Sequence, residues 1–424
     1  MCAFLKNSRQ TNRSSMNILI FNQYFWPENF RINEIAWALK EREHEVEVLT
    51  GKPNYPDGKF FAGYSACGIK LESWRGVPVH RIPMLARGSK SAVKLILNYL
   101  SFIISGLLLA PWMLKNKKFD VIFVYAPSPV FQVIPASFLG WLKGIPVVLW
   151  VQDLWPQSAE ATGYIKSPLL LKLLQKFVQF TYSHTDLILV QSEAFIEPVA
   201  KLAENIPIEY YPNSAEKAFY THDTVTAPEI NSLKSGFTVL FAGNIGVAQS
   251  METIVAAAER LSEYPDIKIV LLGGGSKLDW VKKQVADKKL SNLYLEGRYP
   301  VEVMPILMRQ ASALLVTLAK QPIFELTIPS KIQAYLAVGK PIIACLNGEG
   351  AKIISEANAG VTVEAEDGVG LTEAIIKLYK MPKLAREQMG INGRDYFKRH
   401  FDEEMLTTKL INHFEMVINK KGNH

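Results

Sequence analysis

One stretch in the second half of the chain combines a helix start with a basic side chain, which is what a diphosphate site needs. Pro329 suits the first turn of a helix, Ser330 and Lys331 follow it, and Gly339 ends the helical pattern before the next apolar run. The free N–H groups of such a helix start favour an anion, and the lysine adds a positive charge. The stretch therefore predicts a binding site for a diphosphate.

Two polar side chains flank this predicted helix start. Glu325 lies in the loop before the helix, and Gln333 lies further along it. A carboxylate and an amide at these positions can accept hydrogen bonds from sugar hydroxyls. The two side chains thus add sugar contacts to the predicted diphosphate site.

Glycines follow two strand-like runs of the same half of the chain. Gly243, Asn244 and Gly246 follow the first run, and Gly273 and Gly274 follow the second. Glycine lets the backbone approach a phosphate or a base closely, and the helix start after it favours an anion. Glycines that only make a tight strand-to-helix turn are an equally good interpretation of each group taken singly.

Several other chemistries lack their motifs. The run 18–21 is followed by Gln23 to Glu28 and not by G-x-G-x-x-G, so a nicotinamide enzyme is disfavoured, and no P-loop or G-x-S-x-G is present. The three cysteines, Cys2, Cys67 and Cys345, have no zinc or disulfide spacing. A reducing, cytoplasmic compartment fits this cysteine usage best.

Apolar runs suited to buried strands alternate with helix-like stretches and position these residues. The expected strands are 18–21, 46–50, 121–125, 147–151, 187–190, 237–243, 267–274, 292–297, 313–318 and 341–346. Alternation of this kind predicts parallel sheets with crossover helices on both faces. The fold class is therefore α/β, with two doubly wound domains that face each other across a cleft where ligands bind.

The predicted organisation follows from these patterns. We expect a disordered leader over 1–15 without a secretory signal, with Met16 as a natural start. A first domain over 16–211 is joined by a linker, 212–236, to a second domain over 237–382. Charged helices over 383–424 are expected to fold back over the first domain.

The first half of the chain carries most of the formal net charge of +7 and an uncharged run of twenty residues, 95–114. A basic excess suggests a nucleic acid, an anionic membrane or an acidic substrate as partner, or simply a solvated surface. Three interpretations of 95–114 remain open. They are a transmembrane helix, a helix in the membrane interface with Trp112 at headgroup level, and a buried helix. Aromatic and basic residues do not interleave in any motif, which disfavours nucleic acid.

The chain resembles the retaining glycosyltransferases of family 4, which have the GT-B fold of two facing Rossmann-like domains. The resemblance runs from Met16 over nearly the whole chain and is strongest in the E-x7-E region of 324–344. Within the family, the chain is similar to bacterial fucosamine transferases of surface polysaccharide and O-antigen assembly. The matching segments are Glu43-His44-Glu45-Val46, Trp150 to Pro156, Asp186 to Ser192, Tyr211-Pro212-Asn213, Ala242-Gly243-Asn244 and Ile328 to Lys331.

The resemblance assigns Glu325 to the donor sugar and places Gln333 at the ribose, where the family has a second glutamate. An amide can still bond hydroxyls, so ribose binding is expected to be weakened or re-formed. The Arg and Lys that hold the diphosphate in the family are missing from the region that ends at Gln249. Arg31 and Lys331, and more weakly Arg298, are candidates to supply the missing charge.

Two acidic residues of the first half complete the candidate site. Asp153 occupies a rim position where it could orient a substrate or act as a general base, although an aspartate after a strand is often only a cap. Glu28 lies in the first loop on the expected acceptor side, where a solvated loop residue is the plainer interpretation.

The resemblance implies transfer of a sugar, such as N-acetylfucosamine, from UDP to a polyprenyl-diphosphate-linked saccharide at the inner face of the cytoplasmic membrane. Retention is expected to come from front-face displacement, in which the leaving phosphate helps to deprotonate the acceptor hydroxyl after closure at the linker. No metal and no cofactor are expected, since helix starts and basic side chains would stabilise the leaving group. A nucleotide-sugar epimerase of the same fold and a non-catalytic membrane scaffold remain as alternatives.

Overall fold

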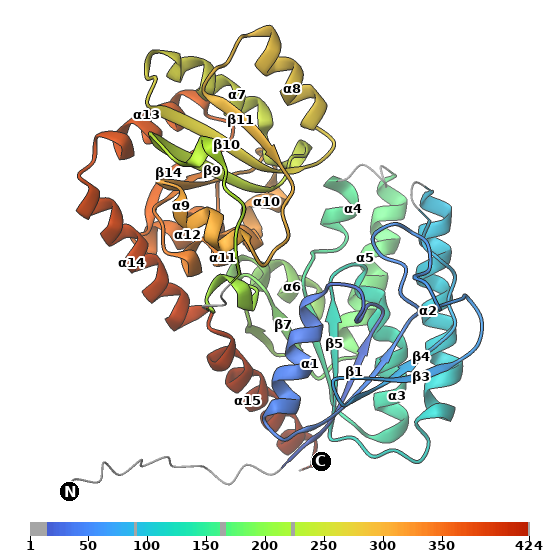
Figure 1. Cartoon of the computed structure of the whole chain (residues 1–424). Helices are drawn as coiled ribbons and strands as arrows, with labels where there is room; N and C mark the ends of the chain where they lie inside the picture. Colours follow the sequence, from blue (N-terminus) through green and yellow to red (C-terminus); the bar gives the residue numbers. More distant parts are fainter. Residues whose placement is uncertain (1–14, 89–90, 162–166, 222–224, 423–424) are drawn as a thin grey trace, which may run out of the picture.

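The computed structural model describes residues 15–88, 91–161, 167–221 and 225–422. It consists of two α/β domains, each built on its own sheet, with a helical C-terminal segment running from the second domain down to the first (Figure 1). The expected α/β fold with two Rossmann-like domains is confirmed. The predicted leader lies almost wholly outside the described residues.

The first sheet has eight strands in the order β3-β4-β2-β1-β5-β6-β7-β8, and every pair is parallel except the β3–β4 hairpin. Its core strands are long apolar runs without alternation, as expected for strands covered by helices on both faces. The strands are β1 (Asn17–Asn22), β2 (Glu45–Thr50), β3 (Lys70–Trp74), β4 (Val77–Arg81), β5 (Val121–Ala126), β6 (Val147–Val151), β7 (Leu187–Val190) and β8 (Ile208–Tyr210).

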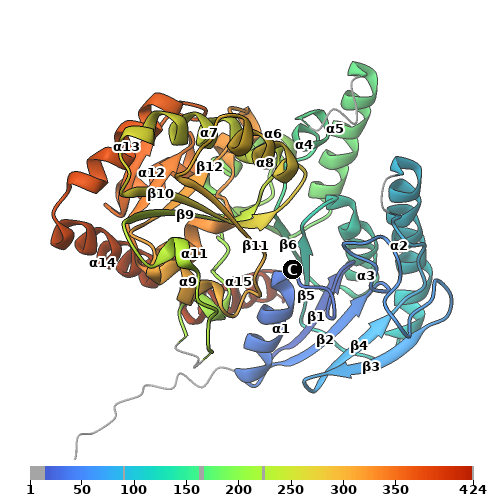
Figure 2. The same cartoon turned by 45° about the horizontal axis from the view of Figure 1, so that its top comes forward.

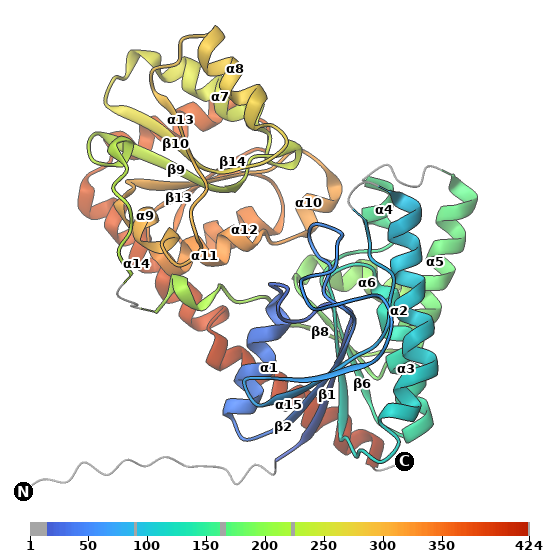
Figure 3. The same ribbon diagram turned by 45° about the vertical axis from the view of Figure 1, so that its right-hand side comes forward.

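Six α-helices belong to this domain within the described residues. They are α1 (Arg31–Glu41), α2 (Ala92–Met113), α3 (Val133–Lys143), α4 (Gln157–Ala161), α5 (Pro168–Ser183) and α6 (Ile196–Ala203). Helices α2, α3 and α5 lie side by side along the flank that faces away from the second domain (Figures 1 and 3).

The second sheet has six parallel strands in the order β11-β10-β9-β12-β13-β14. The strands are β9 (Phe237–Asn244), β10 (Ile267–Gly274), β11 (Leu293–Gly297), β12 (Ala313–Thr317), β13 (Ile342–Cys345) and β14 (Gly360–Val363). Its helices are α7 (Met251–Arg260), α8 (Leu278–Asp287), α9 (Met304–Gln310), α10 (Pro322–Leu326), α11 (Ser330–Val338), α12 (Glu349–Glu356) and α13 (Gly368–Lys380).

The C-terminal helices connect the two domains. Helix α14 (Lys383–His400) packs on α11 of the second domain, and α15 (Glu403–Gly422) continues onto the first. Leu410 and Phe414 of α15 are buried in the core of the first sheet, where the Phe414 ring lies 5.3 Å from that of Phe123. Lys421 Nζ lies 3.1 Å from an Asp186 carboxylate oxygen. The last helix is therefore an integral layer of the first domain (Figure 2).

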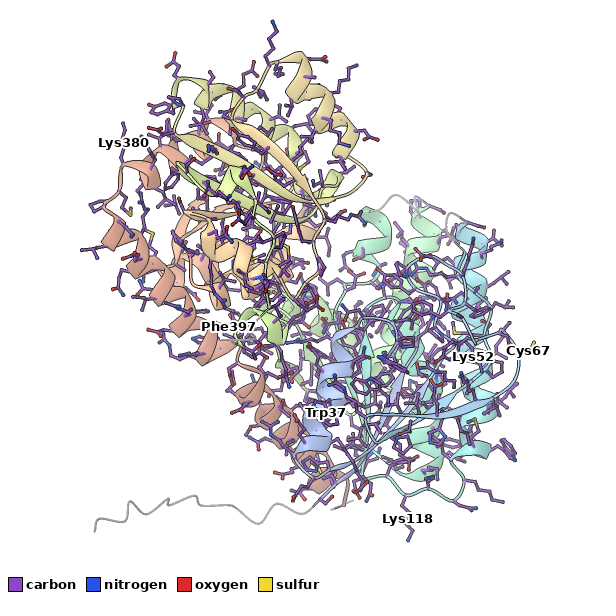
Figure 4. All side chains as sticks on the ribbon, viewed as in Figure 1. Trp37, Lys52, Cys67, Lys118, Lys380 and Phe397 are labelled. Atoms are coloured by element: carbon purple, nitrogen blue, oxygen red, sulfur yellow. The ribbon has the colours of Figure 1, made fainter. Side chains whose placement is uncertain are left out.

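The structure contains elements that the sequence pattern does not predict. The strands β3, β4, β8 and β14 were not anticipated, because their residues are half-exposed and lack a continuous apolar run. The described part of the segment between the domains forms short 3₁₀ turns at Lys217–Phe219 and Asn231–Leu233, with Phe219 and Leu233 buried. Figure 4 shows Phe397 of α14 beside this segment, where its ring lies 5.3 Å from that of Tyr220.

Helix α2 covers the uncharged run and has two unlike faces. Asn98, Phe102, Gly106 and Ala110 are buried against the domain, whereas Leu108 is 70% exposed. A wholly buried helix is therefore the wrong interpretation of this run. Among the described residues, α2 is the one helix long and apolar enough to cross a membrane by length and composition.

Candidate active site

A cavity of about 500 Å³ lies between the two domains and is lined by both. The first domain contributes the loop after β1 and the carboxyl ends of β5 and β6, and the second contributes the end of β9 and the start of α11. Carboxyl ends of parallel strands converge here, as in other doubly wound folds. Its lining includes Asn29, Phe30, Arg31, Tyr125, Gln152, Asn213, Ser214, Ala215, Ala242, Gly243, Ser330 and Lys331.

Lys331 is the most unusual group in this cavity. Its Nζ atom is buried without a hydrogen-bond partner and lies 3.7 Å from the centroid of the Phe241 ring. Burial lowers the pKa of Lys331 to about 7, because the charged ammonium loses its water. A buried cation without a counter-ion is costly, and an anion in the cavity would repay that cost. The position of Lys331 therefore points to an anionic ligand.

The start of α11 supplies further donors for such an anion. Pro329 is the extended N-cap residue, Ser330 and Lys331 form the first turn, and Gly339 ends the helix in the left-handed conformation at φ 76°. No side chain caps the helix start. Its first N–H groups therefore remain available to a phosphate group beside Lys331.

A second cavity of about 370 Å³ adjoins the first and shares Gly243 with it. Asn244, Gly273, Gly274 and Arg298 also line it, at the ends of β9, β10 and β11. A β-carbon at Gly273 would lie 1.8 Å from the Gly243 carbonyl oxygen, and one at Gly274 would lie 2.4 Å from Arg298 Nε. Glycine is therefore needed here for close packing of the strand ends, and the same packing exposes backbone to a ligand.

Gly246 and Gln249, the two remaining candidates of the glycine loops, lie just beyond these strand ends. Asn244 Nδ2 donates to Gln249 Oε1 at 3.3 Å, and a β-carbon at Gly246 would collide with both side chains. Of these two, neither Gly246 nor Gln249 lines either cavity. The pair supports Asn244 at the edge of the second cavity.

Arg31 brings a second basic side chain into the interdomain cavity. Its guanidinium pairs with Glu34 one turn further along α1, and its Nη2 atom donates to the Ala215 carbonyl at 2.6 Å. Arg31 thus ties the first-domain helix to the segment between the domains. It lies in the same cavity as Lys331, as a shared role in charge stabilisation requires.

Glu325 lies outside both cavities, on the short helix α10 that reaches toward the first domain. Its Oε1 atom accepts a hydrogen bond from Asn347 Nδ2 at 3.3 Å. The neighbouring Ile323 and Leu326 pack against the first-domain core, and α10 contacts α4. The structure therefore places Glu325 at the junction of the two domains.

Gln333 does not face a cavity. Its side chain is 1% exposed, and the orientation that satisfies its amide places the nitrogen 3.0 Å from the Pro329 carbonyl and 3.3 Å from the Ser330 carbonyl. The amide therefore stabilises the start of its own helix. Any contact with a ribose would require this side chain to turn outward.

The two acidic candidates of the first domain also lie outside both cavities. Asp153 accepts a hydrogen bond from Ser158 in α4, and burial raises the pKa of its carboxyl. Glu28 is 2% exposed, and its Oε1 atom accepts the backbone N–H groups of Asn54 and Tyr55, each at 2.8 Å. A solvated loop residue is therefore the wrong interpretation of Glu28, which holds two loops together.

Sequence reasoning missed the part of the site made by the segment between the domains. Asn213 Nδ2 donates to Gln152 Oε1 at 2.7 Å, while Gln152 Nε2 and Ser214 Oγ are buried without partners at the cavity. Unpartnered buried polar atoms mark a place where a polar ligand completes the hydrogen bonding. The Tyr-Pro-Asn turn was the available signal.

The described part of the chain offers no set of side-chain ligands for a resident metal ion. No group of three or more His, Cys, Asp and Glu side chains gathers there in a way that could hold an ion. The charged groups that a ligand meets in the interdomain cavity are Arg31, Glu34, Glu216 and Lys331.

Comparisons with known proteins agree with this geometry. Residues 29–214 match the family model described as a glycosyl transferase 4-like domain, and residues 236–381 match that of glycosyl transferases group 1. The chain is 25% identical to the putative colanic acid biosynthesis glycosyl transferase WcaI of Escherichia coli (strain K12), over 94% of this chain and 99% of that protein.

Solved structures with the same arrangement support the fold. Sucrose-phosphate synthase from Thermosynechococcus elongatus superimposes with a TM-score of 0.67 at 14% identity, covering 96% of this chain and 100% of that chain. Anabaena Alr3699/HepE in complex with UDP gives 0.66 at 12% identity, covering 95% and 100%. With a 4-like first domain, a group 1 second domain and a cleft between them, the chain is a glycosyltransferase of the GT-B fold.

Proposed function

We propose that this glycosyltransferase moves a sugar from UDP to a polyprenyl-diphosphate-linked saccharide in the synthesis of a bacterial surface polysaccharide. The single observation that carries the donor half of the proposal is the buried, unpartnered Lys331 ammonium at the start of α11. The 25% identical relative, a putative glycosyl transferase of colanic acid biosynthesis, supports the polysaccharide half. We further propose an N-acetylated deoxyhexose such as N-acetylfucosamine as the sugar.

The proposed donor pose follows from the two adjoining cavities. The diphosphate lies at the start of α11, where Lys331 neutralises its charge and Arg31 faces it from the other domain. The nucleoside lies toward the second cavity, beside Gly273, Gly274 and Arg298. UDP is our choice of nucleotide because Anabaena Alr3699/HepE, which has the same fold, was solved in complex with UDP.

The proposed reaction is front-face displacement with retention at the anomeric carbon. The bond from the sugar to the diphosphate breaks as the acceptor oxygen bonds to the same face. A phosphate oxygen of the leaving UDP takes the acceptor proton. Lys331 and the α11 N–H groups stabilise the charge that develops on the diphosphate, without a metal ion. Closure of the cleft would bring the sugar hydroxyls to Glu325, which α10 holds at the junction of the two domains.

We also propose peripheral association with the inner face of the cytoplasmic membrane through α2. Its buried face holds the helix on the first domain, and its exposed face presents Ile104, Leu108 and Trp112. Interfacial helices of this kind combine an apolar face with basic residues nearby. Lys115, Lys117 and Lys118 follow the helix directly, and Figure 4 shows Lys118 pointing away from the domain.

A thermal-shift screen against UDP, GDP, CDP and TDP tests the donor site. A ligand at about 100 times its Kd adds roughly 2.7 kcal/mol of stability, so a selective rise with UDP is expected. Lys331→Ala should lose the rise, whereas the matched variant Lys282→Ala, whose lysine is exposed on α8, should keep it. A rise with none of the four diphosphates would refute the proposed donor site and favour the scaffold alternative.

Turnover separates the remaining alternatives. Release of UDP that depends on a lipid-linked acceptor supports the transferase, and loss of that release in Glu325→Ala supports the place of Glu325 in the site. Conversion of the nucleotide-sugar without any acceptor would instead favour an epimerase. Full turnover by either Glu325→Ala or Lys331→Ala would overturn the assignment of that residue.

A further inference from the structure

An apolar groove of about 330 Å³ lies on the flank of the first domain, away from the donor cavities. Leu107 of α2, Ile134, Phe138 and Trp141 of α3, and Phe180 of α5 line it. Three helices thus contribute carbon surface to one depression, whose lining is completed by Ser137, Thr181 and His184. Open apolar depressions of this size on a protein surface mark sites for apolar ligands.

The groove lies within a wider apolar surface that is free of negative charge. Helices α2, α3 and α5 contain no aspartate or glutamate. Their exposed side chains include Leu108, Trp141 and Leu169, which are 70%, 75% and 77% exposed. Lys143, Lys172 and Lys176 lie on the same helices. Such a surface is complementary to an anionic headgroup carried on a hydrocarbon chain.

The groove runs away from the donor cleft along α3. Tyr125, at the end of β5, lines the interdomain cavity, and the chain then passes through the turn Val130–Gln132 into α3. Ile134 in the first turn of α3 lines the groove, and Trp141 lines it two helical turns later. A chain lying in the groove can therefore have one end directed toward the cleft.

We propose that this groove binds the isoprenoid chain of the lipid acceptor, next to the diphosphate that links this chain to the saccharide. The inference rests on the proposed transfer to a lipid-linked saccharide and adds a chain-binding site to it. The groove excludes water from the first isoprenoid units, and this orients the saccharide toward the cleft. The groove is a depression of about 330 Å³ and not a flat face, which distinguishes it from the broad contact with the bilayer surface.

Photolabelling with a benzophenone analogue of farnesyl diphosphate tests the site directly on the full chain. Labelling is expected on the peptides that contain Ile134 to Trp141, and farnesyl diphosphate should compete while inorganic pyrophosphate should not. Labelling elsewhere would overturn the proposal. Equal competition by monomeric dihexanoyl phosphatidylglycerol would also overturn it, because the site would then take any acyl chain of the bilayer.

Matched variants connect the label to the groove. Ser137→Leu should fill the groove, since Ser137 lines it and is 9% exposed. Trp141→Ala removes a wall from an exposed position and does not threaten folding. Both should reduce labelling at least fivefold, whereas Leu384→Ala, at an exposed leucine of α14 outside the groove, should leave it unchanged. Unchanged labelling in both groove variants would contradict the proposal.

The two proposals fail separately in this experiment. If the groove is labelled but the protein turns over no donor with any acceptor, the proposed transfer is refuted and the proposed isoprenoid site is not. Turnover that is equally efficient with citronellyl-linked and undecaprenyl-linked acceptors would refute the groove and leave the transferase standing. In the expected outcome, KM falls with chain length in the wild type and becomes independent of chain length in Ser137→Leu.

Discussion

Gly243 and Lys331 lie against each other in the wall of the interdomain cavity, where a β-carbon at Gly243 would lie 2.7 Å from Lys331 Cε. Gly243 also has a φ of 130°, which L side chains rarely adopt. The end of β9 therefore leaves room for the lysine only because it has no side chain. This relationship explains why the strand end and the helix start depend on each other.

Gly243→Ala should consequently weaken UDP binding by displacing Lys331. Backbone strain at this φ costs about 1–3 kcal/mol, so the melting temperature should fall by several degrees as well. Gly76→Ala is the matched control, because Gly76 has a φ of 79° but no atom within 4 Å of the added carbon. It should lose stability and keep its affinity for UDP. Equal UDP affinity in Gly243→Ala and the wild type would contradict the prediction.

The affinity for UDP should fall as pH rises above 7. In the empty protein the pKa of Lys331 is about 7, whereas a bound diphosphate stabilises the ammonium and raises that pKa. Above pH 7, binding must therefore take up a proton, and the affinity should fall by up to about tenfold per pH unit. Calorimetry at pH 8.5 in two buffers should detect close to one proton taken up. No uptake in the wild type would contradict this.

The same group should destabilise the empty protein most at low pH. The unfolded lysine binds its proton up to about pH 10.5, and the folded one loses it near pH 7. The cost of burial is therefore complete below pH 7 and declines as pH rises, with an upper limit of roughly 5 kcal/mol at 1.36 kcal/mol per pKa unit. Lys331→Met should raise the melting temperature more at pH 6 than at pH 9. A gain that is equal at both values would be evidence against the buried charge.

Much of the fold could be predicted because its central strands are buried on both faces. The runs at β6 and β7 have the same bounds in the sequence pattern and in the structure, since uninterrupted apolar residues are needed there. The β3–β4 hairpin could not be predicted in the same way. Its strands are half-exposed, and Pro78 interrupts β4, the second strand from the sheet edge, so the segment lacks the continuous apolar run of a buried strand.

The candidate site was predictable in its backbone and not in its side-chain directions. Proline and glycine defined the ends of α11, and so they located Lys331 at a helix start. The inward turn of Gln333 depends on a choice of rotamer that spacing does not determine. The contribution of Asn213 and Ser214 depends on how two domains meet, and no periodic pattern reports that.

Glu28 should influence stability and leave UDP binding unchanged. Burial raises the pKa of its carboxyl to about 7, compared with 4.5 in the unfolded chain. The folded state thus binds more protons between these values, so this group makes the protein less stable as pH rises from 5 to 7.5, by up to roughly 3 kcal/mol. Glu28→Gln lacks this dependence. Urea unfolding of the wild type and of Glu28→Gln at pH 5 and 7.5 should show this pH dependence. A difference in unfolding free energy between the two proteins that is the same at both pH values would disprove the prediction.

The contact of α10 with the first domain should control the catalytic rate more than the affinity for UDP. Ile323 and Leu326 flank Glu325 and pack against the first-domain core, whereas the proposed contacts of Lys331 and of the nucleoside belong to the second domain. Leu326→Ala removes about 1–2 kcal/mol of apolar contact, enough to let α10 move and to lower kcat roughly tenfold. The Kd for UDP should change by less than about threefold.

Lys352→Ala provides the comparison, because it breaks another contact between the domains without changing a residue of α10. Lys352 Nζ lies 2.8 Å from Glu193 Oε2, in a partly exposed ion pair that contributes about 0–1 kcal/mol. Its kcat should therefore change little. If Leu326→Ala and Lys352→Ala lowered kcat equally, general closure of the cleft would be limiting and the positioning of Glu325 would not. If Leu326→Ala weakened UDP binding as strongly as it lowered kcat, α10 would act on the nucleotide and the proposed division of the site would be wrong.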